Sequence, residues 1–397
     1  MNEEIVFMSE SVTAGHPDKL CDQISDAIVD DFMAGDPDSS VDAECALASG
    51  ILFVSAHYAS RAEVDVSAIA RKTLAQAAYP PDVFDAENCT IMTSFEDHTE
   101  KNYRTLDIDT LDDAALGRIT SKHQVTVFGY ACDQTPELMP LPISLAHRLA
   151  AQLDSAKVLK ALPYLLPDGK TQVGIEYKSG KPARIHSLNL VASRKDSDAV
   201  DIEQLRSDLN KHVIEPVLKK EACPHDEKTM ISVNPEGIII GGGPSAHSGL
   251  TGRKTSMDSY GSYSRQSGAA LSGKDPWRID RIGAYISRYA AKNIVAAGLA
   301  AECEIQLSYT IGSAMPVSLR IRTFGTSQID EQQLAERVRS VIDFRPGAIV
   351  RNFGLHKLPG EKKPDGFYRN LAAYGHMGRP ELDLPWERTD RIDELKP

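Results

Sequence analysis

The sequence has no long hydrophobic run, and none of its apolar stretches approaches the roughly 20 residues that a membrane-spanning helix needs. Its start, Met1–Glu4, is acidic and lacks the basic segment that opens a secretory signal peptide. The 6 cysteines are scattered without any CxxC pair, which favours reduced thiols over a disulfide framework or a zinc site. We therefore expect a cytoplasmic protein with no membrane partner.

Positive charge is also scarce. The 44 lysines and arginines stand against 56 acidic residues, which gives a formal net charge of −12. Nonspecific binding to nucleic acid needs a net basic surface, so nucleic acid is not an expected partner. A phosphate site needs only a local cluster of cations and stays open. The phosphate-binding patterns GxxxxGK[ST] and GxGxxG after a strand are both absent, so any nucleotide must be held by another geometry.

What the chain does contain is one order of elements repeated three times. With 397 residues it is long enough for two or three domains. Helix, two strands and helix recur at a spacing of roughly 125–135 residues. The predicted elements are a helix at 17–33, strands at 44–48 and 51–57 and a helix at 66–77; a helix at 142–159, strands at 171–177 and 183–191 and a helix over 202–217; and a helix at 281–297, strands at 302–311 and 317–324 and a helix at 329–342.

This order predicts an α+β fold of three similar domains related by a pseudo-threefold arrangement. Each domain is expected to have a mixed or antiparallel sheet with helices on one face. The other face needs cover that a second subunit could supply, so we expect sheets to pack across a dimer interface. We place an N-terminal domain at 1–105, a central domain at 118–233 and a C-terminal domain at 234–397, with segments exchanged between domains. The stretch 100–122 is long enough for a mobile lid, and the tail from His356 is expected to wrap the surface.

The first candidate site is the segment His16-Pro17-Asp18-Lys19 at the start of an amphipathic helix. Pro17 suits the first helical position, so His16 should lie at a helix N-terminus. Unpaired backbone N–H groups and the helix dipole favour an anion there. The motif therefore indicates either a well-capped helix or a place that holds polyphosphate together with a metal ion.

The second candidate site is the segment 241–281, which is rich in glycine and in basic residues. Glycines allow backbone N–H groups to approach ligand oxygens closely. Asp280 is a candidate Mg²⁺ ligand, because Mg²⁺ takes one or two carboxylates together with phosphate oxygens. The alternative is a flexible surface loop with solvated cations. The basic residues concerned are Arg253, Lys254, Lys274 and Arg278.

Seven stretches carry a resemblance when taken together: 9–11, 15–19, 22–27, 250–254, 272–276, 292–300 and 373–376. They resemble the S-adenosylmethionine synthetase (methionine adenosyltransferase) family, and the resemblance runs from residue 5 to residue 390. It implies active sites at the interface of a homodimer, which in this family often pairs into a homotetramer. It also implies that the methionine sulfur attacks C5′ of ATP and displaces triphosphate, which is then hydrolysed to pyrophosphate and phosphate.

The resemblance also implies roles for single residues. A departing triphosphate carries about four negative charges, so cations must stabilise the transition state. The residues implied in catalysis are His16, Lys170, Arg253, Lys254 and Lys274. The further residues implied in ATP binding are Asp168, Ile239 and Ala270. The residues implied in metal binding are Asp18 and Asp280 for Mg²⁺ and Glu44 for K⁺.

The chain departs from the family pattern where the amino acid should bind. Histidines stand where the family has acidic or amide side chains, and Ile239 stands where the family has an aromatic residue for adenine. Neutral imidazoles do not offer a methionine ammonium the full charge of carboxylates. They suit an anionic nucleophile or a soft metal instead, unless they are ordinary surface histidines. The predicted nucleophile pocket consists of His57, His98, His123, His247, Arg278 and Ile311.

We therefore predict an ATP-dependent adenosyltransferase that forms S-adenosylmethionine from ATP and L-methionine, with Mg²⁺ and K⁺ as cofactors. One alternative is a paralogue that keeps triphosphate displacement but adenosylates a different small nucleophile. The other alternative is a noncatalytic regulatory subunit.

Overall fold

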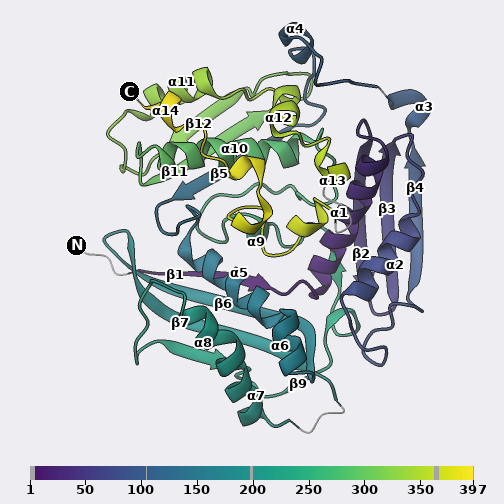
Figure 1. The fold of residues 1–397 in the computed structure, drawn as a ribbon, viewed down its shortest axis with the longest axis vertical. Coiled ribbons are helices and arrows are strands. Elements are labelled where there is room, and N and C mark those ends of the chain that lie inside the picture. Colours follow the sequence, from purple (N-terminus) through teal and green to yellow (C-terminus); the bar gives the residue numbers. More distant parts are fainter. Residues whose placement is uncertain (1–4, 104, 197–199, 362–365, 397) are drawn as a thin grey trace.

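The computed structural model describes residues 5–103, 105–196, 200–361 and 366–396. The acidic start at 1–4 lies outside the described residues. The fold consists of three β-sheets, each with helices packed on it (Figure 1). The predicted α+β class is therefore confirmed. Among the described helices, none is long and apolar enough to cross a membrane.

The N-terminal sheet has the strand order β10-β2-β3-β4 and stands at the right of Figure 1, with α1 and α2 packed on one face. Strands β2 and β3 form an antiparallel hairpin, and β4 runs parallel to β3. The elements are β2 (Ser40–Ala48), β3 (Ile51–Ala59), β4 (Thr90–Asp97), β10 (Gly249–Leu250), α1 (Pro17–Gly35) and α2 (Val66–Gln76).

The central sheet has the order β1-β6-β7-β8, with β9 also paired to β7, and it has a hydrophobic core of its own. The long antiparallel hairpin β6–β7 forms the middle of this sheet, and α5 packs against β1 and β6. The elements are β1 (Ile5–Val12), β6 (Leu165–Lys178), β7 (Lys181–Arg194), β8 (Met230–Val233), β9 (Ile239–Ile240), α5 (Leu141–Leu153), α6 (Ala156–Ala161), α7 (Ile202–Leu209) and α8 (Glu215–Leu218).

The third sheet has the order β12-β11-β5, and its core is continuous with that of the N-terminal sheet. Helix α10 packs against β5 and β11, and α11 packs against β12. The elements are β5 (Val125–Cys132), β11 (Glu302–Tyr309), β12 (Ser318–Arg322), α10 (Ile279–Ala296), α11 (Glu331–Val341), α12 (Pro346–Phe353) and α14 (Ile392–Leu395). Short helices outside the sheets are α3 (Thr99–Asn102), α4 (Asp113–Leu116), α9 (Thr255–Asp258) and α13 (Leu358–Glu361).

Each hairpin receives an extra antiparallel strand from a distant part of the chain. Strand β1 joins β6 of the central sheet, β5 joins β11 of the third sheet, and β10 joins β2 of the N-terminal sheet. Because β1 lies in the central sheet while α1 covers the N-terminal sheet, the loop between them crosses the seam of the two sheets. His16 ends that loop and is therefore placed at the seam.

Local sequence signals explain which predicted helices match the structure and which are interrupted in it. Helix α1 begins at Pro17, as predicted, because the His16 side chain accepts the first-turn N–H of Asp18. The single helix predicted at 142–159 is wrong: α5 ends at Leu153, and Ser155 caps a new helix by accepting the N–H of Val158 at 3.3 Å. The helix predicted over 202–217 is interrupted by the π-helical turn Asn210–Ile214.

The C-terminal tail does not wrap the surface as predicted. Trp386 and Tyr368 are fully buried, and the Trp386 ring stacks on Tyr285 of α10 with 3.7 Å between ring centroids. Its indole N–H donates to the carbonyl of His376 at 2.9 Å. The aromatic residues between the glycines and prolines of this segment therefore anchor it in the core.

Gly129 on β5 lies at a very close contact between the third sheet and α10. A Cβ added there would lie 2.0 Å from the backbone carbonyl carbon of Ser287, which has no side-chain freedom to yield. We expect Gly129→Ala to reduce the free energy of unfolding by about 1–3 kcal/mol or more. Thermal unfolding should show a lower midpoint. Gly50→Ala is the control, because nothing lies within 4 Å of a Cβ there; equal midpoints for the two variants would contradict the prediction.

Candidate active site

Several predicted side chains gather where the loop after β1 meets the segment around β10. Asp18 is buried in the first turn of α1, and its carboxylate accepts the N–H of Leu250 at 3.0 Å. The same carboxylate lies 3.2 Å from the ammonium of Lys254 and 3.6 Å from the guanidinium of Arg253. One buried anion thus holds two cations at the edge of the N-terminal sheet. We call this cluster the phosphate-side group, and its members are His16, Asp18, Asp168, Lys170, His247, Arg253 and Lys254.

His16 is held as a neutral imidazole. Burial lowers the pKa of His16 to about 4, although Asp168 and Asp18 oppose the shift. Its Nδ1 accepts the backbone N–H of Asp18 at 3.2 Å, so the cap of α1 leaves the proton on Nε2. The ring therefore presents a hydrogen-bond donor at neutral pH without carrying a charge.

Asp168 and His247 form a second pair beside this imidazole. The Nε2 atom of His247 lies 2.8 Å from Oδ2 of Asp168, and the N–H of Gly243 donates to the same oxygen at 2.8 Å. Burial alone would raise the pKa of Asp168, but these hydrogen bonds hold it below its ordinary value. The other oxygen, Oδ1, is buried without a protein partner. It is therefore an open acceptor next to His16, whose ring lies 4.8 Å from that of His247.

A cavity of about 260 Å³ opens beside the phosphate-side group. Lys170 on β6 and Lys254 both line it, together with Ser11 and Gln172. Lys170 reaches this place because β6 pairs with β1 in a register that sets it opposite Val12, four residues before His16. Two ammonium groups on the wall of one cavity favour an anionic ligand.

The remaining predicted cations lie in a separate cluster at the start of α10. Asp280, buried in the first turn, lies 3.4 Å from the Lys274 ammonium and 3.0 Å from Nδ1 of His123. Arg278 forms an ion pair with Asp42 of β2 at 3.0 Å. We call this cluster the α10 group, and its members are Asp42, His123, Lys274, Arg278 and Asp280. Its Asp42 was missed from the sequence, although the alternation of β2 puts that residue on the same face as Glu44.

The other predicted residues take separate places. Ile311 lies in the turn after β11, where the N–H of Gly312 donates to Ser121 at 2.9 Å, and so it neighbours the loop that carries His123. Ala270 contacts the Gly252 turn, and Glu44 and Ile239 are exposed. His57 and His98 lie against Glu96 on the outer face of the N-terminal sheet.

The phosphate-side group and the α10 group lie toward opposite ends of strand β2. Leu250, bonded to Asp18, pairs with Ala46 of β2, whereas Asp42 of the same strand carries Arg278. Four residues of extended strand span about 13 Å. Among the residues that the structure describes, no hydrogen bond or ion pair joins the two groups. One chain therefore presents two separate partial sites.

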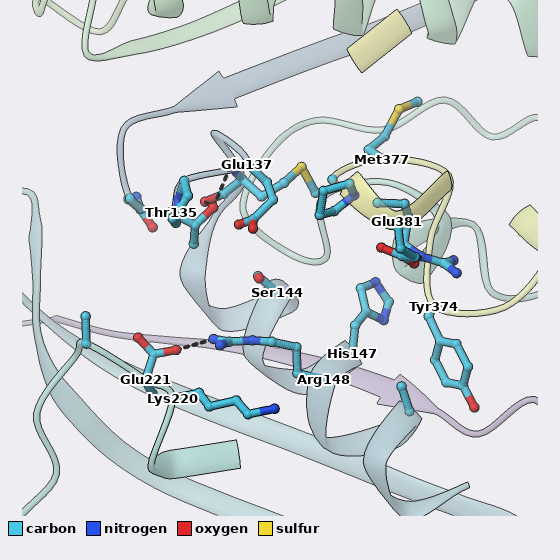
Figure 2. A pocket seen from close by; sticks show the side chains of 18 residues that line it. Thr135, Glu137, Ser144, His147, Arg148, Lys220, Glu221, Tyr374, Met377 and Glu381 are labelled. Atoms are coloured by element: carbon cyan, nitrogen blue, oxygen red, sulfur yellow. Dashed lines mark hydrogen bonds and ion pairs between the residues drawn. The ribbon is translucent and has the colours of Figure 1, made fainter. Parts of the chain in front are cut away.

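A cavity of about 460 Å³ elsewhere contains none of the predicted site residues (Figure 2). It lies between α5 and the C-terminal segment, with His147 and Tyr374 on its walls and an ion pair between Arg148 and Glu221 at one side. Burial lowers the pKa of His147 to about 3, so this histidine is neutral. The predicted site residues lie instead along the N-terminal sheet and on the adjoining strand β6, which carries Asp168 and Lys170.

The fold and the site together define a class of protein. It is an α+β protein of three helix-covered sheets, in which buried carboxylates hold cations at a sheet edge. Comparison with known proteins gives the family. Residues 4–100 match the S-adenosylmethionine synthetase N-terminal domain, 118–239 the central domain and 240–388 the C-terminal domain. The chain belongs to the S-adenosylmethionine synthetase family, and the family expected from the sequence motifs is confirmed.

Relatives match over nearly the whole chain. An S-adenosylmethionine synthase of Trichodesmium erythraeum is 44% identical over 412 residues, covering 100% of this chain and 97% of the relative. One of Synechococcus elongatus is 44% identical over 410 residues, covering 100% and 98%. One of Thermosynechococcus vestitus is 43% identical over 405 residues, covering 98% and 97%.

Proposed function

We propose that this chain is a cytoplasmic, ATP-dependent adenosyltransferase that forms S-adenosylmethionine from ATP and L-methionine and hydrolyses the displaced triphosphate. The names of its relatives support the reaction. The observation that supports it most is the phosphate-side group. Lys170 and Lys254 line one cavity there, and Lys254 also contacts Asp18, whose backbone N–H is held by the neutral imidazole of His16. Such a site suits an oxygen-rich anion that gains charge as it departs.

The chemistry follows from the placement of these side chains. The sulfur lone pair forms the S–C5′ bond, the C5′–O bond breaks, and its electron pair stays on the triphosphate. His16 donates its Nε2–H to the departing oxygen, while Lys170 and Lys254 stabilise the developing negative charge. Arg253 binds a terminal phosphate and holds it for hydrolysis.

Two buried carboxylates fit the predicted Mg²⁺ ions. Asp18 and Asp280 each lie beside a lysine that would bind phosphate, which matches the preference of Mg²⁺ for one carboxylate together with phosphate oxygens. When bound, Mg²⁺ would neutralise phosphate charge. Glu44, opposite Ser55 on the same sheet face, offers a carboxylate and a hydroxyl toward K⁺.

We further propose that the active site forms between two copies of the chain. The outer face of the N-terminal sheet exposes large apolar side chains between its two charged ends: Phe53 is 42% exposed, Met92 53% and Leu250 48%. A twofold axis through the middle of this face places one end of the first chain against the other end of the second chain. Each phosphate-side group then meets the α10 group of the partner. Dimers of this kind can pair further into tetramers.

Complementation tests this arrangement. His16→Asn damages the phosphate-side group and Lys274→Met damages the α10 group, so each variant alone should be nearly inactive. Refolded together, they should recover about a quarter of the wild-type activity, because half of the random dimers carry one intact site of two. The control mixes His16→Asn with Lys254→Met, which damage the same group and should recover nothing. Equal recovery in both mixtures would contradict an interfacial site.

The proposed reaction is tested by incubating the protein with ATP, Mg²⁺, K⁺ and L-methionine and measuring products by mass spectrometry. S-adenosylmethionine together with pyrophosphate and phosphate is expected. The second candidate, transfer to a different nucleophile, is favoured by the imidazoles of His57 and His98, which take the place of acidic or amide side chains. Triphosphate cleavage without S-adenosylmethionine would support that candidate. No cleavage with any nucleophile would support a regulatory subunit.

A further inference from the structure

Three side chains gather on the outer face of the N-terminal sheet, where His57 is the cross-strand partner of Asp42. His57 of β3 and Glu96 of β4 are direct partners in the parallel pairing of these strands. His98 follows β4, and its backbone N–H donates to the carbonyl of Tyr58 at 2.7 Å. Sheet hydrogen bonds thus fix the backbone of all three residues, so their proximity is a property of the sheet.

The distances between the polar atoms suit a shared ion better than direct hydrogen bonds. Oε2 of Glu96 lies 3.4 Å from Nδ1 of His57 and 3.6 Å from Nε2 of His98. Both separations exceed the usual length of about 2.7–3.2 Å for a hydrogen bond. Ligand atoms at about 2.1 Å around a tetrahedral Zn²⁺ stand roughly 3.4 Å apart. The three ligand atoms lie within 4.8 Å of one another, so small side-chain rotations bring all three to bonding distance of one ion.

We propose that His57, Glu96 and His98 form a binding site for a divalent transition metal of the zinc class. Two imidazoles and one carboxylate are the donor set that such ions prefer, whereas Mg²⁺ favours oxygen ligands alone. The two rings lie 6.0 Å apart at 15° to one another, which allows both to approach one ion from the same side of the sheet.

The site has room for a further ligand. In the single chain the side chains are 51% exposed for His57, 63% for Glu96 and 39% for His98. Three protein ligands leave the fourth position of a tetrahedral ion open toward the proposed dimer interface. Asp42, the cross-strand partner of His57, forms an ion pair with Arg278. Glu96 is therefore the carboxylate available to the two histidines. The open position would take water or a small anionic or sulfur donor.

The metal site shares His57 and His98 with the predicted nucleophile pocket, so this inference deepens the proposed function and rests on it for that pocket. Metal binding itself requires neither ATP nor methionine, so a titration without substrates distinguishes its failure from a failure of the proposed reaction. Within the part of the chain that the structure describes, one other histidine set competes for the same ion: His16, Asp168 and His247 also place three ligand atoms within 4.8 Å. That set is largely buried, and its Asp168 oxygen is already bound by Gly243 and His247. Variants in each set therefore distinguish the two positions.

The test is calorimetric titration of the metal-free full-length protein with Zn²⁺, without nucleotide. The wild type should bind one equivalent that the double variant His57→Gln/His98→Gln lacks, and Glu96→Gln should weaken that equivalent at least tenfold. His225→Gln is the matched control, because this exposed histidine lies outside both sets. Excess Mg²⁺ should not displace the ion.

Two results would overturn the proposal. One is an unchanged stoichiometry and affinity in the double variant, and the other is loss of the same equivalent in His247→Gln. X-ray absorption at the zinc edge provides a second readout, in which two imidazole ligands should be lost together with the equivalent. Thermal unfolding of each variant confirms that it is folded, as expected for exposed side chains.

Discussion

Replacing His16 with asparagine is expected to lower kcat for S-adenosylmethionine formation by about 10²–10³-fold, while KM for ATP changes only a few-fold. In this structure His16 has two tasks. Its Nδ1 caps α1 by accepting the N–H of Asp18. Its Nε2–H is proposed to donate to the departing oxygen. An asparagine oxygen can take over the cap, because asparagine is a preferred N-cap residue. The substitution therefore removes the donor and keeps the helix start.

Two further measurements separate these tasks. His16→Ala removes both, so it should lose kcat to the same extent and lose about 1 kcal/mol of stability in addition. Steady-state kinetics and thermal unfolding of the three proteins provide the comparison. Retained kcat in His16→Asn would mean that His16 only caps the helix. A large rise in KM with unchanged kcat would assign it to ATP binding rather than to the chemical step.

The sequence predicts those parts of the fold that depend on local pattern. The helix from Pro17 and the hairpin strands are recovered because apolar periodicity, caps and turns act within a few residues. The exchange of strands among the sheets was expected only in outline. Which strand joins which hairpin depends on contacts across long stretches of chain, as in the pairing of Ser9 with Val173. No local rule contains that register.

The candidate site, like the fold, could be predicted from the sequence only in part. Motifs predicted His16, Asp18, Arg253 and Lys254, because their types and spacing suit phosphate and metal chemistry. The family resemblance added Asp168 and Lys170, and it assigned His247 to the nucleophile pocket instead. The structure adds their partners. The pairing of Asp168 with His247, and of Asp42 with Arg278, joins residues that no spacing rule connects. Glu96 was not singled out, because an exposed carboxylate on an edge strand is ordinary until the neighbouring histidines are placed beside it.

Replacing the buried Arg281 with methionine is expected to produce the largest loss of stability, about 3–5 kcal/mol at pH 8. Its guanidinium is fully buried, forms an ion pair with Asp26, donates to the carbonyl of Leu271 at 2.8 Å and lies over the ring of Tyr368. Asp26 also accepts the N–H of Gly273, next to Lys274, at 2.8 Å, but its second oxygen has no protein partner. Without Arg281 this carboxylate has no countercharge.

The loss should depend on pH in a defined direction. Burial raises the pKa of Asp26 to about 7 even with Arg281 beside it, so removing the guanidinium raises that pKa further. Between the unfolded and the folded pKa the native state binds the extra proton, and the free energy of unfolding falls as pH rises. The defect of Arg281→Met should therefore be smaller at pH 5 than at pH 8, as measured from denaturant midpoints.

The double variant Asp26→Leu/Arg281→Met separates the loss of a charge pair from the loss of packing. Removing both charges takes away the uncompensated carboxylate, so the double variant should be more stable than Arg281→Met at pH 8. Its stability should also fall less between pH 5 and pH 8 than that of Arg281→Met, because the contribution of Asp26 is gone. A double variant that is less stable than the single one, or equal defects at the two pH values, would contradict this account. Because Gly273 is bonded to Asp26, a surviving fold with reduced activity would further indicate that this ion pair positions Lys274.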